Sequence, residues 1–139
     1  MLRKFSATLL LAAAMFAAGC DNDVENAPGP TDPNPTVTET FTGTLNTNGA
    51  ATHQFIVLAS GDVTARISEI TPDATIKVGF ALGRVNGTIC ESIIAKDEAV
   101  QGEALIGRVT GQGILCVRVH DPNGKLTAAL NYSLSVEHP

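Results

Sequence analysis

Apolar and polar residues alternate along most of this 139-residue chain from residue 36 onward, and this pattern restricts the fold more than any other feature. The clearest example lies near the C-terminus, where polar residues separate Leu130, Tyr132, Leu134 and Val136. Successive side chains of a strand point to opposite faces, so such a segment has one buried and one solvated face. The pattern therefore predicts β-strands that each contribute one face to a core.

Turn residues divide the pattern into eight short segments. The predicted strands cover residues 36–45, 53–59, 63–68, 76–82, 89–95, 104–109, 114–120 and 130–136. We expect a tight hairpin at Asn86-Gly87 and a polar excursion between strands at residues 96–102. No helical period follows the first 20 residues. The chain is therefore predicted to be all-β, an antiparallel β-sandwich or jelly roll of about eight strands.

The first 20 residues have the pattern of an export signal. Arg3 and Lys4 precede an apolar run of about 14 residues, which is short of the roughly 20 that a spanning helix needs. Small residues at positions 17–19 then lead into Cys20. This segment resembles the signal of bacterial lipoproteins, although that family prefers leucine where Ala17 stands. An ordinary secretory signal followed by an incidental cysteine is the alternative.

The resemblance implies a signal peptide at residues 1–19 and a diacylglycerol on the Cys20 thiol. The protein would then be attached to a membrane by lipid, without a spanning helix. Residues 21–35 contain four of the seven prolines and four acidic residues, with no lysine or arginine. Such a segment cannot bury enough apolar surface to fold, so residues 20–35 are predicted to be the lipidated cysteine and a disordered tether.

Residues 36–139 remain as one domain with a single core. This part has ten acidic and seven basic residues, so it lacks the basic stripe that a phosphate backbone requires. Nucleic acid is therefore not an expected partner. Cys90 and Cys116 are the two cysteines of this domain, and in an exported domain they are most simply a disulfide. Two free buried thiols or a metal site are the alternatives, and a disulfide requires the two residues on neighbouring strands.

Candidate catalytic groups are sparse. His53, His120 and His138 are far apart and have no metal-ligand spacing, so each is expected to be a solvated histidine at the rim. The Gly111-x-Gly113 pattern leads into a strand, which leaves it without the helix N-terminus of a phosphate site. Four carboxylates cluster near the polar excursion: Glu91, Asp97, Glu98 and Glu103. We predict no catalytic residue, no metal and no cofactor.

The order of the segments resembles the bacterial pre-peptidase C-terminal domain. The matching segments are Phe41–Leu45, Phe55–Val57, Gly61–Thr64, Ile76–Leu82, Gly113–Val119 and Tyr132–Leu134. The resemblance spans about residues 37–137 and implies a β-sandwich with a non-catalytic accessory role beside secreted enzymes. Some members bind calcium near the start of the domain, but this chain offers only Glu39 there, so no calcium site is predicted.

These observations predict a non-catalytic cell-envelope lipoprotein that faces the periplasm or the cell exterior. Because no enzyme domain accompanies the sandwich, we expect an accessory role to be exercised alone or through a separate partner. The partner would be an envelope protein or polysaccharide, bound through the loops or the threonine-rich face. The absence of tryptophan weakens a lectin interpretation. The alternatives are a structural or self-associating envelope subunit, and a hydrolase that uses Asp, Glu and His from different loops.

Overall fold

The computed structural model describes residues 35–139. Its eight strands are β1 (Val37–Leu45), β2 (Ala50–Val57), β3 (Gly61–Thr71), β4 (Val78–Asn86), β5 (Ile89–Ala99), β6 (Ala104–Val109), β7 (Gly113–His120) and β8 (Leu130–His138), with one 3-10 turn, η1 (Pro122–Gly124). The prediction of an all-β fold of about eight strands is confirmed. The predicted signal peptide, Cys20 and nearly all of the tether lie outside the described residues. No helix within residues 35–139 is long and apolar enough to cross a membrane.

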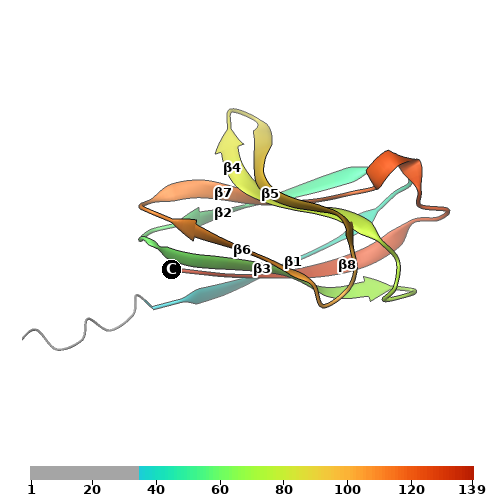
Figure 1. Ribbon diagram of the computed structural model, residues 1–139, viewed down its shortest axis with the longest axis horizontal. Helices are drawn as coiled ribbons and strands as arrows, with labels where there is room; N and C mark the ends of the chain where they lie inside the picture. The colour runs from blue at the N-terminus through green and yellow to red at the C-terminus, as the bar shows by residue number, and fades with distance from the viewer. Residues whose placement is uncertain (1–34) are drawn as a thin grey trace, which may run out of the picture. The chain divides into compact units, whose positions relative to one another are not determined.

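Two four-stranded antiparallel sheets pack against each other (Figure 1). The first sheet has the order β1-β8-β3-β6, and the second has the order β2-β7-β4-β5. Among these strands β4 and β5 are the one consecutive pair that shares a sheet, so the other connections cross between the sheets. Edge strands β1 and β2 therefore lie along one side of the sandwich, and β5 and β6 lie along the other.

The core lies between the sheets and follows the predicted alternation. In β8 the side chains of Leu130, Tyr132, Leu134 and Val136 are buried, while Asn131 is exposed. Other large core residues come from both sheets: Leu45, Ile67, Ile70, Phe55, Phe80 and Val117. The alternation in sequence therefore corresponds to an inner and an outer face of each sheet.

β4 is buried on both faces over Val78–Gly83. Its inner side chains enter the core, whereas its outer positions are small and are covered by neighbouring strands. A Cβ atom on Gly79 would overlap the ring of His120, and one on Gly83 would overlap the main-chain oxygen of Glu91. Glycine at these two positions therefore allows the chain to pack directly on the outer face of β4.

β5 is longer than its pattern indicates. The strand continues to Ala99, so the prediction of a polar excursion is wrong for residues 96–99, where Lys96 pairs with Phe80 and Ala99 pairs with Val78. β5 is an edge strand with mostly exposed side chains, and backbone pairing there is compatible with a polar sequence. β4 begins at Val78, two residues after the predicted start at Ile76.

The β4–β5 ladder contains a bulge that bends the hairpin. Leu82 pairs with Ile94 and Gly83 pairs with Ser92, which leaves Ile93 without a partner on β4. An extra residue on one strand bends the strand and increases its twist. In Figure 1 the end of the β4–β5 hairpin rises away from the rest of the second sheet.

A disulfide between Cys90 and Cys116 connects this bent hairpin to β7. Cys90 pairs with Val85 on β4, and Cys116 pairs with Gly83 on the other edge of the same strand. The two Cα atoms are 5.8 Å apart, which is within the usual range for a disulfide. The cysteines are therefore neither free thiols nor metal ligands.

Asp121 holds two loops together at the end of the sandwich opposite to the start of β1. It is 7% exposed, and its carboxylate accepts hydrogen bonds from the main-chain N–H of Asn48 at 2.8 Å and of Leu126 at 3.1 Å. Its own N–H donates to the carbonyl of Gly49 at 2.9 Å. The β1–β2 turn and the loop before β8 are thus joined through one buried side chain.

Candidate functional site

The three histidines occupy separate environments. The Nε2 atom of His53 lies 2.9 Å from the hydroxyl of Tyr132, and its ring stacks on Phe41 with centroids 5.0 Å apart. Partial burial lowers the pKa of His53 and raises the pKa of Tyr132. A Cβ atom on Gly43 would overlap the Tyr132 ring, so any larger residue at this position would displace the ring. The cluster closes the side of the sandwich between β1 and β2.

His138 is 3% exposed, so the prediction of a solvated rim histidine is wrong for this residue. Its Nε2 atom lies 3.0 Å from Oε1 of Glu39, and its ring packs on Phe55 at 5.1 Å between centroids. The sequence places His138 near the end of the chain, where exposure is the usual expectation. Here the last strand lies between β1 and β3, and its inner face carries His138 into the interior.

His120 lies on the outer face of the second sheet, over Gly79. Its Nδ1 atom is buried and has no hydrogen-bond partner in the described part of the chain. Burial and the charge of Arg118 lower its pKa, against smaller opposing effects of Asp97 and Asp121. His120 therefore covers a backbone surface and shares no partner with His53 or His138.

The carboxylates near β5 are mostly engaged in surface ion pairs. The pairs are Arg84–Glu91 at 2.8 Å, Lys77–Glu98 at 3.0 Å and Lys96–Glu103 at 3.0 Å. Hydrogen bonds from these lysines lower the pKa of Glu98 and of Glu103. Between residues 35 and 139, no group of three or more His, Cys, Asp or Glu side chains could hold a metal ion. The structure thus does not bring the candidate catalytic residues of this region together.

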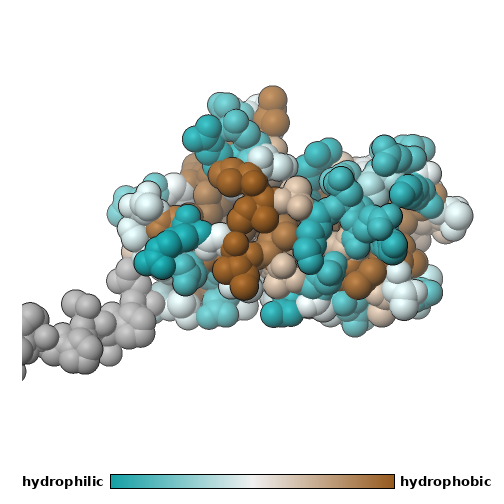
Figure 2. All heavy atoms as spheres, viewed as in Figure 1, coloured by the Kyte–Doolittle hydropathy of each residue, from teal (hydrophilic) through white to brown (hydrophobic). Residues whose placement is uncertain are grey.

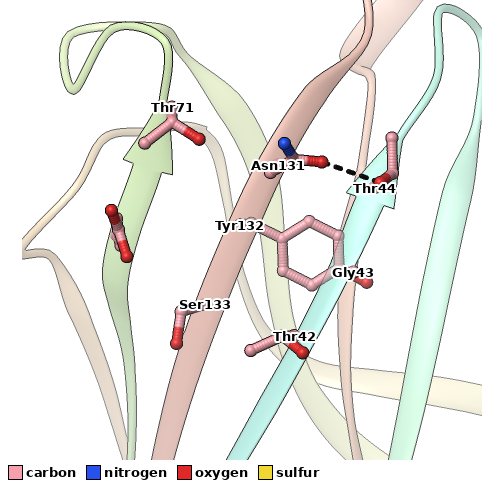
Figure 3. Close-up of a pocket in the computed structure, with 8 residues that line it drawn as sticks. Thr42, Gly43, Thr44, Thr71, Asn131, Tyr132 and Ser133 are labelled. Carbon is pink, nitrogen blue, oxygen red and sulfur yellow. Dashed lines mark hydrogen bonds between the residues drawn. The ribbon is translucent and has the colours of Figure 1, made fainter.

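The outer face of the first sheet carries the threonine-rich surface. β1 presents a row of exposed threonines, which are Thr38, Thr40, Thr42 and Thr44. Figure 3 shows the end of this face, where a shallow hollow of about 380 Å³ lies among side chains of β1, β3 and β8. In it the Thr44 hydroxyl donates to Oδ1 of Asn131 at 2.7 Å. The hydroxyl of Tyr132 is directed to His53, so the hollow offers polar groups and no exposed aromatic ring.

An apolar groove opens where the bent hairpin faces β6 and the β6–β7 turn. It consists of two adjoining hollows of about 80 and 510 Å³ that share Ile93, Arg108, Val109 and Leu115. We call it the hairpin groove, and its other main apolar residues are Val57, Leu82 and Ile94. Ile93 is 67% exposed. Figure 2 shows a band of apolar surface below the hairpin, in contrast to the hydrophilic surface on either side.

Two arginines stand at the rim of the hairpin groove. Arg84 pairs with Glu91 at 2.8 Å, and Arg108 pairs with Asp62 at 3.2 Å. The hydrogen bond from Arg84 to Glu91 raises the pKa of the guanidinium. Both arginine side chains are more than 60% exposed, so a ligand can reach them. The groove therefore combines an apolar floor with a rim of two exposed arginine–carboxylate ion pairs.

Sequence reasoning did not identify this groove. It depends on the bulge at Ile93, which turns one isoleucine of β5 out of the regular ladder. The adjacent pair Ile93-Ile94 breaks the period of two within the predicted strand 89–95, and this was the available signal. The groove also needs β5 and β6 to be edges of different sheets, which the alternation of side chains does not specify.

Comparison with known proteins supports the fold. No family model and no curated protein matches this chain. Four solved chains match, among them the crystal structure of Aeromonas hydrophila PliG, described as a periplasmic lysozyme inhibitor of g-type lysozyme. The match has a TM-score of 0.50 and 15% sequence identity, and it covers 71% of this chain and 83% of that chain. This similarity shows a shared fold, and the resemblance to the pre-peptidase C-terminal domain stays a prediction.

Proposed function

We propose that this protein is a lipid-anchored, non-catalytic module of the bacterial cell envelope that binds another protein through the hairpin groove. The cationic start, the short apolar run and Cys20 support lipid anchoring. The resemblance to an accessory domain of secreted enzymes supports a non-catalytic role. The PliG neighbour is described as a periplasmic inhibitor of an enzyme, which supports a protein as the partner and an envelope location.

The hairpin groove is the observation on which the binding role rests. Ile93 is largely exposed beside the partly buried side chains of Ile94, Val109 and Leu115. Burial of such a side chain by a partner is favourable, because it removes apolar surface from water. Arg84 and Arg108 stand at the rim as exposed guanidinium groups that are each paired with a carboxylate, so they offer hydrogen-bond donors next to that contact with little net charge. The partner is therefore a protein segment that presents an apolar side chain flanked by hydrogen-bond acceptors.

Replacement of Ile93 by aspartate is expected to weaken capture of the partner about tenfold or more, since it removes one apolar contact and adds a charge that must be desolvated. The measurement is quantitative mass spectrometry of proteins recovered with the mature chain from detergent-solubilised envelope. Ile106→Asp is the matched control, because Ile106 is also 67% exposed on an edge strand and does not line the groove. Equal recovery with both variants, or no reproducible recovery, would contradict the proposal.

Replacement of Cys20 by serine is expected to move the protein from the membrane fraction to the soluble envelope fraction, because the thiol that carries the lipid is lost. One acyl chain binds a membrane only marginally, whereas two or three hold a protein firmly. The mass of the native mature protein should correspond to residues 20–139 plus the acyl groups. An unmodified Cys20 in native protein would show that the anchor is wrong, and it would leave the test of the groove unaffected.

A further inference from the structure

We propose that the end of the sandwich next to the tether rests on the lipid bilayer, through an apolar patch formed by Val37, Ile56 and Leu58. We call it the membrane patch. The inference relies on the proposed lipid anchor to bring the domain to a membrane. The patch adjoins the hairpin groove, but none of its three residues lines that groove, and its test does not depend on binding there.

The patch consists of three large aliphatic side chains that are each at least half exposed. Val37 is 51% exposed, Ile56 is 59% exposed and Leu58 is 67% exposed. All three line one open hollow of about 370 Å³. Single exposed aliphatic residues are common on soluble proteins, but a contiguous group marks a surface that is covered by something.

The surroundings of the patch are poor in polar groups. Pro35 and Ala59 complete much of the apolar lining of the hollow, and a proline within the chain has no N–H to solvate. Ile56 also pairs across the strands with Ile114, which is 50% exposed and continues the apolar surface along the second sheet toward the hairpin groove. This composition suits contact with acyl chains better than contact with water.

Glu39 is the acidic residue that lines the hollow, and its position reduces the cost of approaching a membrane. Its Oε1 atom lies 3.0 Å from Nε2 of the buried His138, so the carboxylate is engaged at the inner side of the patch. A carboxylate with such a hydrogen-bond partner has a lower desolvation cost than an unpaired one. The patch can therefore reach the lipid surface without leaving this group unpaired.

The position of the patch in the chain identifies the bilayer as its occupant. Val37 is the first residue of β1, and Pro35 next to it is where the chain leads back to Cys20, 15 residues earlier. A lipid on Cys20 would hold this end of the domain close to the membrane surface at a high effective concentration. A weak apolar contact that would be negligible in solution becomes populated under that constraint.

The chain has no tryptophan, so a single introduced tryptophan reports its own depth in the bilayer. The mature chain from Cys20 is coupled through that thiol to a maleimide lipid in phosphatidylethanolamine–phosphatidylglycerol vesicles, which imposes the anchor chemically. We expect brominated acyl chains to quench the fluorescence of Leu58→Trp at least about twofold, since an interfacial apolar group lies 5–10 Å into the headgroup region. Thr47→Trp, in the turn at the other end of β1, should be unaffected.

Each outcome decides the inference. Quenching of the fluorescence of Leu58→Trp, without quenching of Thr47→Trp, supports the inference. Loss of that quenching when Ile56→Asp is combined with Leu58→Trp assigns the membrane contact to the patch. If coupled vesicles carry the protein but Leu58→Trp is not quenched, the inference is overturned. A dimer in sedimentation that Leu58→Asp dissociates would overturn it in favour of a second copy. Because the coupling is chemical, these results stand whether or not native Cys20 carries lipid.

Discussion

Replacement of Cys90 and Cys116 together by alanine is expected to lower the free energy of unfolding by about 3 kcal/mol, because the disulfide closes a loop whose ends are 26 residues apart. For a domain of this size the midpoint of thermal unfolding should fall by about 10–20 °C. The β4–β5 hairpin, which the disulfide connects to β7, should lose its ordered structure before the rest of the domain. Thermal unfolding followed by circular dichroism measures the effect.

The unmodified protein with and without a reducing agent is the matched control, since it has the same side chains in both states. Reduction of the disulfide should reproduce most of the decrease in stability expected for the double variant. Hydrogen exchange of Val85–Ile89 should accelerate before that of the core strand β8. A double variant as stable as the oxidised protein would show that the bulge and the packing on Gly83 hold the hairpin without the disulfide.

The replacement Asp121→Ala should lower the free energy of unfolding by about 3 kcal/mol, because the buried N–H of Leu126 and the partly buried N–H of Asn48 both lose their acceptor. The turn that contains Asn48 is expected to loosen, since this residue has a φ of 56°. Urea denaturation measures the change in stability.

Asp73→Ala is the matched control for this prediction. Asp73 also accepts two hydrogen bonds, from the N–H and the hydroxyl of Thr75, and these bonds lower its pKa. Its side chain is exposed, so water can replace the lost acceptor and the effect should be much smaller. Asp121→Asn should fall between the two, since one side-chain oxygen remains as an acceptor. Similar decreases in the free energy of unfolding for Asp73→Ala and Asp121→Ala would show that burial of the carboxylate does not determine the size of the decrease.

The sequence was sufficient to predict the strands whose two faces differ. β8 alternates regularly from Leu130 to Val136, and the row of threonines marks the solvated face of β1, because each strand has one face toward the core and one toward solvent. The Asn86-Gly87 hairpin follows from local chemistry, and Gly87 has the positive φ that such a turn uses. The disulfide was predictable from the number of cysteines together with the expected export of the chain.

The features that make the candidate site could not be predicted in this way. The extension of β5 to Ala99 depends on pairing with β4, and an edge strand carries no apolar signature of its own. The hairpin groove depends on the unpaired position of Ile93 and on the packing of Glu91 against Gly83, which are contacts between segments. His138 is buried because β8 is an inner strand, and strand order is not encoded in the alternation.

The placement of the last strand has a consequence for folding. Val37 at the start of β1 pairs with His138, next to the final residue, and β8 separates β1 from β3. The first sheet therefore cannot assemble until the C-terminal segment has been delivered, and closing such distant ends makes folding slow. The ladder between β1 and β8 joins segments that are far apart in the sequence, so it should be among the last parts of the core to gain protection from hydrogen exchange during refolding.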